Sequence, residues 1–131
     1  MGSISAVLYN CYDLGGGDPM AEGSVAAVMD TVNVAITGLL TTAQECHADL
    51  KSNKGLLLVT SSGIGATDIP PPMEEFVVGL NLTGYCVAKA AQQKLTSQLA
   101  FKLKPDGFQT QARWHLCRNC VCKWHGERNQ V

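Results

Sequence analysis

The sequence YCVAKAAQQKLTSQLAFKLKP occupies residues 85–105 and sets the pattern for the rest of the chain. It predicts one amphipathic helix, because apolar residues recur at helical spacing along one stripe: Val87, Ala88, Ala91, Leu95, Leu99 and Leu103. Glutamines and lysines, Gln92 and Gln93 among them, fill the other faces, and Pro105 ends the helix. Tyr85 and Lys89 stand four residues apart, so both side chains are expected on one helical face, within reach of a shared ligand.

Length and composition indicate a single globular domain. The chain has 131 residues, of which 46% are hydrophobic, and this is enough for one core. The formal net charge of −1 predicts no nucleic acid partner. No continuous apolar run approaches the length of a membrane span, and the N-terminus, MGSIS, lacks the pattern of a secretory signal. We therefore expect no membrane partner and a cytoplasmic protein.

Strand and helix patterns alternate before residue 85. Residues 4–9 predict a short buried strand, and GLLLVT at 55–60 predicts a strand buried on both faces of a parallel sheet. Between them, apolar residues at steps of three or four predict a long helix over residues 20–50, interrupted at Asn33 and Gly38. The order strand, long helix, strand, loop, helix predicts an α/β fold with right-handed crossovers.

Polar residues stand at the ends of both predicted strands. Asn10 follows the first strand and Ser62 follows the second. In open α/β sheets, ligands bind beyond the carboxyl ends of the strands. Asn33, close to the apolar stripe of the long helix, is either a functional group or an amide that distorts the helix or is satisfied within the core. These three residues join the tyrosine–lysine pair as site candidates.

Taken together, these segments resemble the short-chain dehydrogenase/reductase family. YCVAK at 85–89 matches the family's YxxxK motif, and LLVTSS at 57–62 resembles its strand ending in the catalytic serine. TVNV at 31–34 resembles its asparagine-bearing helix, and VLYNCY at 7–12 matches part of its NNAG strand end. The resemblance covers roughly residues 6–108. It implies a partial Rossmann-like, doubly wound parallel sheet with a βαβα core and long helices at about 20–50 and 85–104.

The resemblance also implies roles for the candidate residues. Family members transfer hydride between NADP or NAD and a small carbonyl or alcohol substrate. Tyr85 would exchange a proton with the substrate oxygen, and Ser62 would hydrogen-bond that oxygen. Lys89 would hold the cofactor ribose, with Tyr85 and Asn10 beside it, and Asn33 would order a water relay behind Lys89. The ammonium of Lys89 is expected to lower the pKa of Tyr85.

The chain departs from the family pattern in three places. Nothing before Ile4 matches the family's TGxxxGxG loop. Ser62 and Tyr85 are 85 − 62 = 23 residues apart, more than is usual, so the intervening residues must loop out. From residue 109 the sequence turns polar, which predicts a domain at 1–108 and a poorly ordered, non-family tail at 109–131 without a strand of comparable quality.

The six cysteines fall into two groups. Cys11, Cys46 and Cys86 stand in apolar surroundings and are expected to be buried free thiols. The others crowd the tail, where CxxC is half of a zinc site: Cys117, Cys120 and Cys122, with His125 nearby. No second CxxC follows, so we expect no metal site.

Two functions remain open from the sequence. The first is an NAD(P)-dependent oxidoreductase of the short-chain type. The second is an inactive fragment that acts as an interaction module, because family members commonly dimerise through the helices that correspond to residues 20–50 and 85–104. A sheet of two strands with two helices cannot be covered on both faces, so we expect a marginally stable chain that forms homo-oligomers through these helices.

Overall fold

The computed structural model describes residues 2–14, 21, 24–65, 69–107 and 109–114. Three parallel strands form one sheet in the order β1-β2-β3: β1 (Ala6–Tyr9), β2 (Leu56–Ser61) and β3 (Gln109–Trp114). Val7 of β1 pairs with Leu57 of β2, and Val59 of β2 pairs with Ala112 of β3. The predicted α/β class with a parallel sheet is confirmed.

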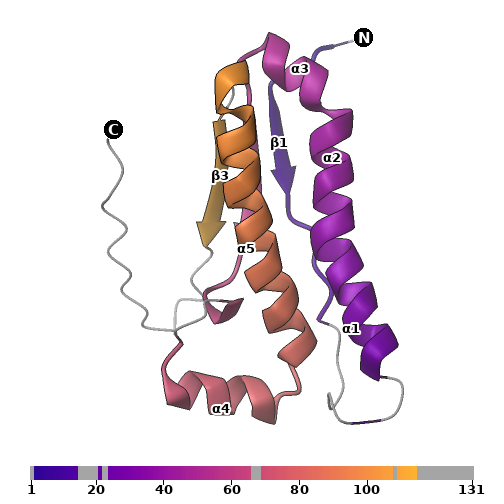
Figure 1. Ribbon diagram of the computed structural model, residues 1–131, viewed down its shortest axis with the longest axis vertical. Coiled ribbons are helices and arrows are strands. Elements are labelled where there is room, and N and C mark those ends of the chain that lie inside the picture. Colours follow the sequence, from indigo (N-terminus) through magenta and orange to yellow (C-terminus); the bar gives the residue numbers. More distant parts are fainter. Residues whose placement is uncertain (1, 15–20, 22–23, 66–68, 108, 115–131) are drawn as a thin grey trace.

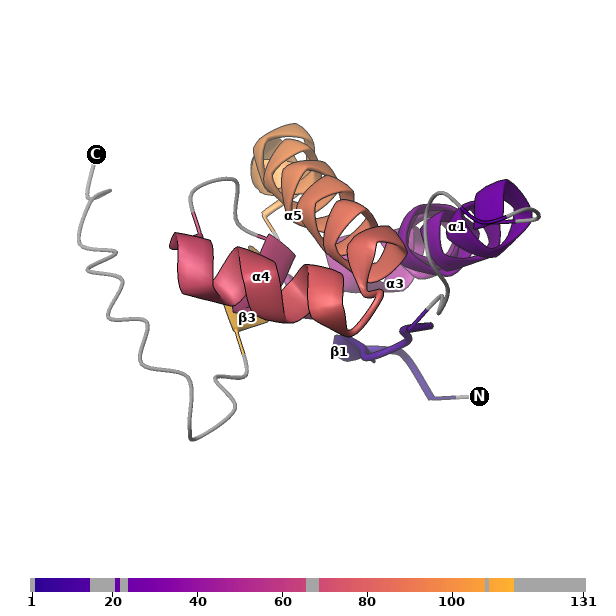
Figure 2. The same cartoon turned by 90° about the horizontal axis from the view of Figure 1, so that it is seen from below.

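Helices make up most of the remaining described chain. In chain order they are α1 (Ser24–Val32), the π-helix η1 (Asn33–Gly38), α2 (Leu39–Glu45), α3 (His47–Ser52), the short 3₁₀ segment η2 (Gly63–Gly65), α4 (Pro71–Gly79), α5 (Thr83–Leu103) and the 3₁₀ segment η3 (Lys104–Asp106). The helices α2 and α5 lie over one face of the sheet (Figure 1, Figure 2). The chain moves from β1 to β2 and then to β3 in the same direction across the sheet. Because both crossover connections are right-handed, their helices lie on the same face.

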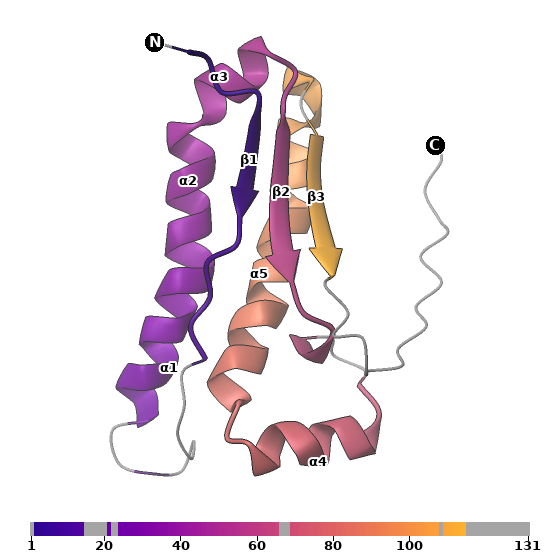
Figure 3. The same ribbon diagram turned by 180° about the vertical axis from the view of Figure 1, so that it is seen from behind.

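The opposite face of the sheet carries no helix among the described residues, as the view from behind shows (Figure 3). Side chains of β2 alternate accordingly: Leu57 and Val59 are fully buried, whereas Leu56 and Leu58 are only partly buried. Leu8 of β1, on the uncovered face, is 63% exposed. The expectation that β2 is buried on both faces is therefore wrong, because the described helices cover one face of the sheet.

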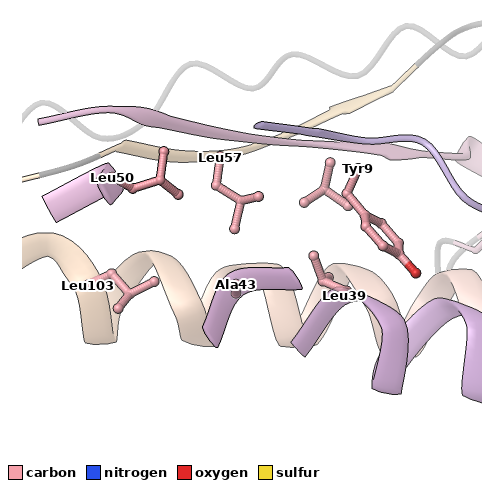
Figure 4. Close-up of a cluster of buried hydrophobic side chains, with 7 residues drawn as sticks. Tyr9, Leu39, Ala43, Leu50, Leu57 and Leu103 are labelled. Atoms are coloured by element: carbon pink, nitrogen blue, oxygen red, sulfur yellow. The ribbon is translucent and has the colours of Figure 1, made fainter. Parts of the chain in front are cut away.

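The core lies between the sheet and the helices (Figure 4). Its buried members come from every layer of the fold: Tyr9, Leu39, Ala43, Leu50, Leu57, Val59 and Leu103. Gly38 allows the close approach of Tyr9, since a Cβ at that position would overlap the tyrosine hydroxyl. This hydroxyl donates a hydrogen bond to the Val34 carbonyl. The core thus fixes β1 against η1.

The predicted long helix over residues 20–50 is present in part but is not one α-helix. The described helix begins at Ser24, and the hydrogen-bond pattern widens to a π-helix over Asn33–Gly38. Residues 33 and 38 are the positions where the sequence pattern was interrupted. A further break at Cys46 separates α2 from α3. The start expected near residue 20 lies outside the described residues.

The expectation that no strand follows residue 108 is wrong for the first six residues of the tail. Gln109–Trp114 forms β3 and pairs with β2 over its whole length. Just before it, Asp106 of η3 holds two residues of α3, with His47 Nε2 and Lys51 Nζ each 2.8 Å from a carboxylate oxygen. The rest of the tail, with its three cysteines and His125, lies outside the described residues.

The stretch Val25–Glu45 is long and apolar enough, by length and composition alone, to cross a membrane, with a mean hydropathy of 1.4. Unbroken apolar runs do not reveal this stretch, because polar residues such as Asp30 and Asn33 interrupt it. Core helices of soluble proteins have the same length and composition. Leu39 and Ala43, on the inner side of this stretch, belong to the core.

The one-sided burial of the sheet gives a stability prediction. Leu57→Ala removes a fully buried side chain and should lower the free energy of unfolding by about 2–5 kcal/mol. Leu8→Ala, on the uncovered face, should change it by less than about 1 kcal/mol. Urea denaturation followed by circular dichroism measures both. Equal losses in the two variants would mean that the uncovered face is buried in solution.

Candidate functional site

The candidate site lies where the carboxyl end of β2 meets the N-terminal half of α5. Gly65, in the segment after β2, lies directly against α5: a Cβ there would stand 2.8 Å from both Lys89 Cβ and the Ala90 nitrogen. This close approach brings Ser62 next to Tyr85, where the serine hydroxyl can hydrogen-bond to the ionised phenol and so acts to lower its pKa. The 22 residues between them include α4, which lies beyond the carboxyl ends of the strands (Figure 1).

Lys89 is the buried charge of the site. Its side chain is 3% exposed, and Nζ donates to the Thr60 carbonyl at 3.1 Å and to Gln92 Oε1 at 3.0 Å. The same nitrogen lies 5.7 Å from the centre of the Tyr85 ring, so the predicted neighbourhood of these two residues is observed. Burial lowers the pKa of Lys89, and the nearby Cys11 opposes that effect.

Tyr85 is half-buried, and its pKa is raised. Burial is the main cause, the hydrogen bond with Ser62 acts in the opposite direction, and Tyr12 and Cys86 add smaller increases. The expectation that the Lys89 ammonium lowers the pKa of Tyr85 is therefore wrong for this chain. The ammonium lies over the ring and is directed to the Thr60 carbonyl and Gln92, and burial outweighs its effect on the phenol.

The buried face of α5 differs from the predicted apolar stripe. Its buried residues include Ala88, Lys89, Gln92 and Thr96, whereas Val87 is 52% exposed. Gln92 is fully buried and also donates to the Ala35 carbonyl in η1 at 3.4 Å. Sequence reasoning placed it on a solvent-facing side because it is polar. The signal that could have located it is its position three residues after Lys89, within hydrogen-bonding reach on a helix.

Gln93, next to it, performs a second positioning contact. Its Nε2 donates to the Ser62 carbonyl at 3.0 Å and so ties the segment after β2 to α5. Sequence reasoning also placed this residue among the outward-facing polar positions. The two adjacent glutamines thus hold different parts of the site, one the lysine and the other the backbone of the serine.

The two asparagines are less directly involved. Asn33 is exposed, and its Oδ1 accepts a hydrogen bond from Thr37 at 3.4 Å. Asn10 is exposed and follows β1 at the same edge of the sheet. Among the described residues, the side chain that bonds directly to Lys89 is Gln92. The roles of Asn33 in a water relay and of Asn10 in cofactor binding remain predictions.

Two residues after β1 also reach the site. The ring of Tyr12 packs edge-to-face on that of Tyr85, with centres 6.3 Å apart. Cys11 is exposed, contrary to the expectation of a buried thiol, while Cys46 and Cys86 are partly buried, and all three are free. Neither contact could be predicted from helical or strand periodicity, since both residues follow β1 in an irregular segment. In the part of the chain that the structure describes, no group of three metal-ligating side chains is present.

Similarity to solved structures was found along most of the chain. A short-chain dehydrogenase/reductase of unknown function from Caenorhabditis elegans, with cofactor, aligns with a TM-score of 0.67 and 17% identity over 84% of this chain and 38% of that one. An oxidoreductase of the same family from Brucella ovis, in complex with a partially ordered NAD, aligns with a TM-score of 0.63 and 23% identity over 86% and 48%.

An alcohol dehydrogenase from Thermococcus sibiricus, complexed with 5-hydroxy-NADP, aligns with a TM-score of 0.59 and 21% identity over 86% of this chain and 42% of that one. The chain has part of the short-chain dehydrogenase/reductase fold. It spans between 38% and 48% of the length of these three solved structures. No protein-family model matches the sequence, and no curated protein matches it significantly.

Proposed function

We propose that this chain carries the proton-transfer part of an NAD(P)-dependent oxidoreductase site of the short-chain type. The observation that supports this most strongly is the convergence of Ser62, Tyr85 and Lys89 at the carboxyl edge of the sheet. Ser62 and Tyr85 come from segments 23 residues apart and still lie close enough for the serine hydroxyl to act on the pKa of the phenol. A plain turn and a solvated helix start would not need this arrangement.

The donor set suits a nicotinamide nucleotide. An ammonium has three N–H donors, and the described residues accept from two of those of Lys89. The third is available to a ribose hydroxyl, and Tyr85 and Asn10 lie at the same edge of the sheet. When bound, the nicotinamide supplies or accepts the hydride. The donors named here would serve NAD and NADP alike, and the solved structures with related folds include a complex with NAD and one with 5-hydroxy-NADP.

The raised pKa of Tyr85 decides its role in the proposal. A phenol that is protonated at neutral pH can donate a proton to a carbonyl oxygen as that oxygen gains negative charge. Ser62, whose hydroxyl lies beside that of Tyr85, would orient the substrate oxygen. At neutral pH the protonated Tyr85 is therefore ready to act in the reduction of a small carbonyl substrate. We also propose that the protein is soluble and cytoplasmic and that it has no nucleic acid partner.

Exposed apolar side chains on α1 and α5 support a second function, that of an interaction module. Large apolar side chains are exposed on the two helices that lie side by side in Figure 1: Val25, Met29, Val87 and Phe101. Soluble monomers rarely expose many such residues together. We therefore propose a homodimer formed through α1 and α5, which is compatible with either an active or an inactive chain.

Cofactor binding tests the oxidoreductase proposal directly. Titration of the purified chain with NADPH and NADH, followed by cofactor fluorescence, should show saturable binding. Lys89→Met should weaken it at least about tenfold, since a charge-assisted hydrogen bond is lost. Lys94→Met, on the exposed side of the same helix, is the matched control and should bind like the wild type. A folded wild-type chain that binds neither nucleotide would contradict the proposal.

The pH dependence of turnover tests Tyr85. Because its pKa is raised, carbonyl reduction should be constant through neutral pH and fall only above that pKa. Alcohol oxidation needs the phenolate and should increase about tenfold per pH unit below the pKa. Tyr85→Phe should lower both rates about 10²–10⁴-fold. Tyr12→Phe, the same change in the adjacent ring, should keep both rates and at most move the profile slightly to lower pH, because Tyr12 contributes a small part of the raised pKa of Tyr85. A similar loss of rate in both variants would argue against Tyr85 as the proton donor.

Sedimentation equilibrium tests the proposed dimer. The wild type should associate reversibly, and Val87→Glu should weaken association at least about tenfold, because a charge would be buried against apolar side chains. Lys94→Glu, on the same helix, serves as the charge control and should associate normally. Monomeric behaviour of the wild type, or equal weakening by both variants, would rule out this interface.

A further inference from the structure

Three structural elements meet at Gln92. Its Oε1 accepts from Lys89 Nζ at 3.0 Å, within α5, and its Nε2 donates to the Ala35 carbonyl of η1 at 3.4 Å. Through Lys89, which also donates to the Thr60 carbonyl, the same chain of hydrogen bonds reaches β2. The lysine is therefore held between the sheet on one side and the π-helix on the other.

The orientation of the Gln92 amide follows from its partners. An ammonium can only donate, so it requires the amide oxygen. A backbone carbonyl can only accept, so it requires the amide nitrogen. In the flipped orientation, the amide NH₂ would face the ammonium of Lys89 and the amide oxygen would face the Ala35 carbonyl, so neither hydrogen bond could form. The two neighbours therefore fix which end of the amide faces which element.

Packing alone does not account for a glutamine at this position. Gln92 is 0% exposed, and a buried amide without partners is destabilising, so an apolar residue of similar size would fill the space at lower cost. Thr96, one turn further along the buried face, shows the difference. Its hydroxyl bonds back to the Gln92 carbonyl of its own helix at 2.8 Å and so reaches no other element. By contrast, both ends of the Gln92 amide form hydrogen bonds, one with the Lys89 ammonium and one with the Ala35 carbonyl of η1.

We propose that Gln92 is a positioning residue that fixes the Lys89 ammonium against the π-helical segment, by bridging Lys89 Nζ to the Ala35 carbonyl. The catalytic meaning of this bridge rests on the proposed oxidoreductase function, whereas the bridge itself does not. Behind Lys89, Gln92 provides a direct side-chain hydrogen bond, whereas the family resemblance implied a water relay from Asn33.

Other groups face Lys89 and must be considered in any test. The Thr60 carbonyl is contributed by β2, the ring of Tyr85 lies one helical turn before it, and Cys11 approaches from the segment after β1. Of these, only Tyr85 and Cys11 titrate. Their contributions remain when Gln92 is replaced, so a change in Lys89 upon substitution at position 92 reports on the bridge.

The test is an NMR titration of the whole chain labelled with ¹³C at lysine Cε, with the Lys89 signal assigned from Lys89→Met. In Gln92→Met, which keeps the volume but removes both hydrogen bonds, the titration midpoint of Lys89 should move to lower pH. In Gln92→Glu, which keeps the acceptor and adds a negative charge, it should move to higher pH. Thr96→Val is the control for altering a buried polar residue and should leave the midpoint unchanged.

Unchanged Lys89 midpoints in folded Gln92→Met or Gln92→Glu would overturn the proposal, as would an equal change in Thr96→Val. If Gln92→Met does not fold, Gln92→Glu decides by itself. Nucleotide binding by the same variants separates this inference from the proposed function. If the wild type binds NADPH, Gln92→Met should weaken binding about tenfold, and undiminished binding would overturn the positioning role. If the wild type binds neither nucleotide, the oxidoreductase proposal fails and the NMR titration alone decides on Gln92.

Discussion

The burial of one ammonium, that of Lys89, constrains the structure around it. A charge that is 3% exposed is tolerated only where acceptors surround it, because an unpaired buried charge is strongly unfavourable. The carboxyl end of β2 provides one acceptor through Thr60, and α5 itself provides another through Gln92. The register of α5 along the sheet is therefore set by this residue as well as by apolar packing. Ser62 and Tyr85 meet because α5 is fixed in this position.

The π-helical segment η1 extends the same network. Its wider hydrogen-bond pattern leaves backbone carbonyls that side chains can reach, and such segments are frequent at functional sites. Tyr9 donates to the Val34 carbonyl, Gln92 to that of Ala35 and Thr42 to that of Gly38. Each bond joins η1 to a different part of the chain: β1, α5 and α2. The segment η1, which lies between α1 and α2, is therefore where these parts of the chain are joined. Through Gln92 it is also connected to Lys89 in the site.

Patterns of residue type predicted the parallel α/β fold and the meeting of Tyr85 with Lys89, because both depend on local spacing. These patterns did not predict the burial of side chains whose position depends on hydrogen-bond partners elsewhere in the fold. Gln92 is polar, so periodicity placed it in solvent, although two hydrogen bonds compensate for its burial. The segment QTQARW lacks apolar alternation, yet β3 forms because pairing with β2 uses backbone groups that every residue carries. The pKa of Tyr85 depends on burial, which spacing alone does not show.

One face of the sheet is not covered by the described helices, and this bears on how much a bound ligand could stabilise the chain. Parallel strands are usually covered on both faces, whereas here Leu8 is exposed and Leu58 only partly buried on the face that no described helix covers. The solved structures that share the fold are at least twice as long as the part matched here. A ligand that binds only the folded state stabilises that state by mass action. Under the oxidoreductase function proposed above, a nucleotide held by Lys89 would therefore add to the stability of a fold whose described helices pack against one face of the sheet.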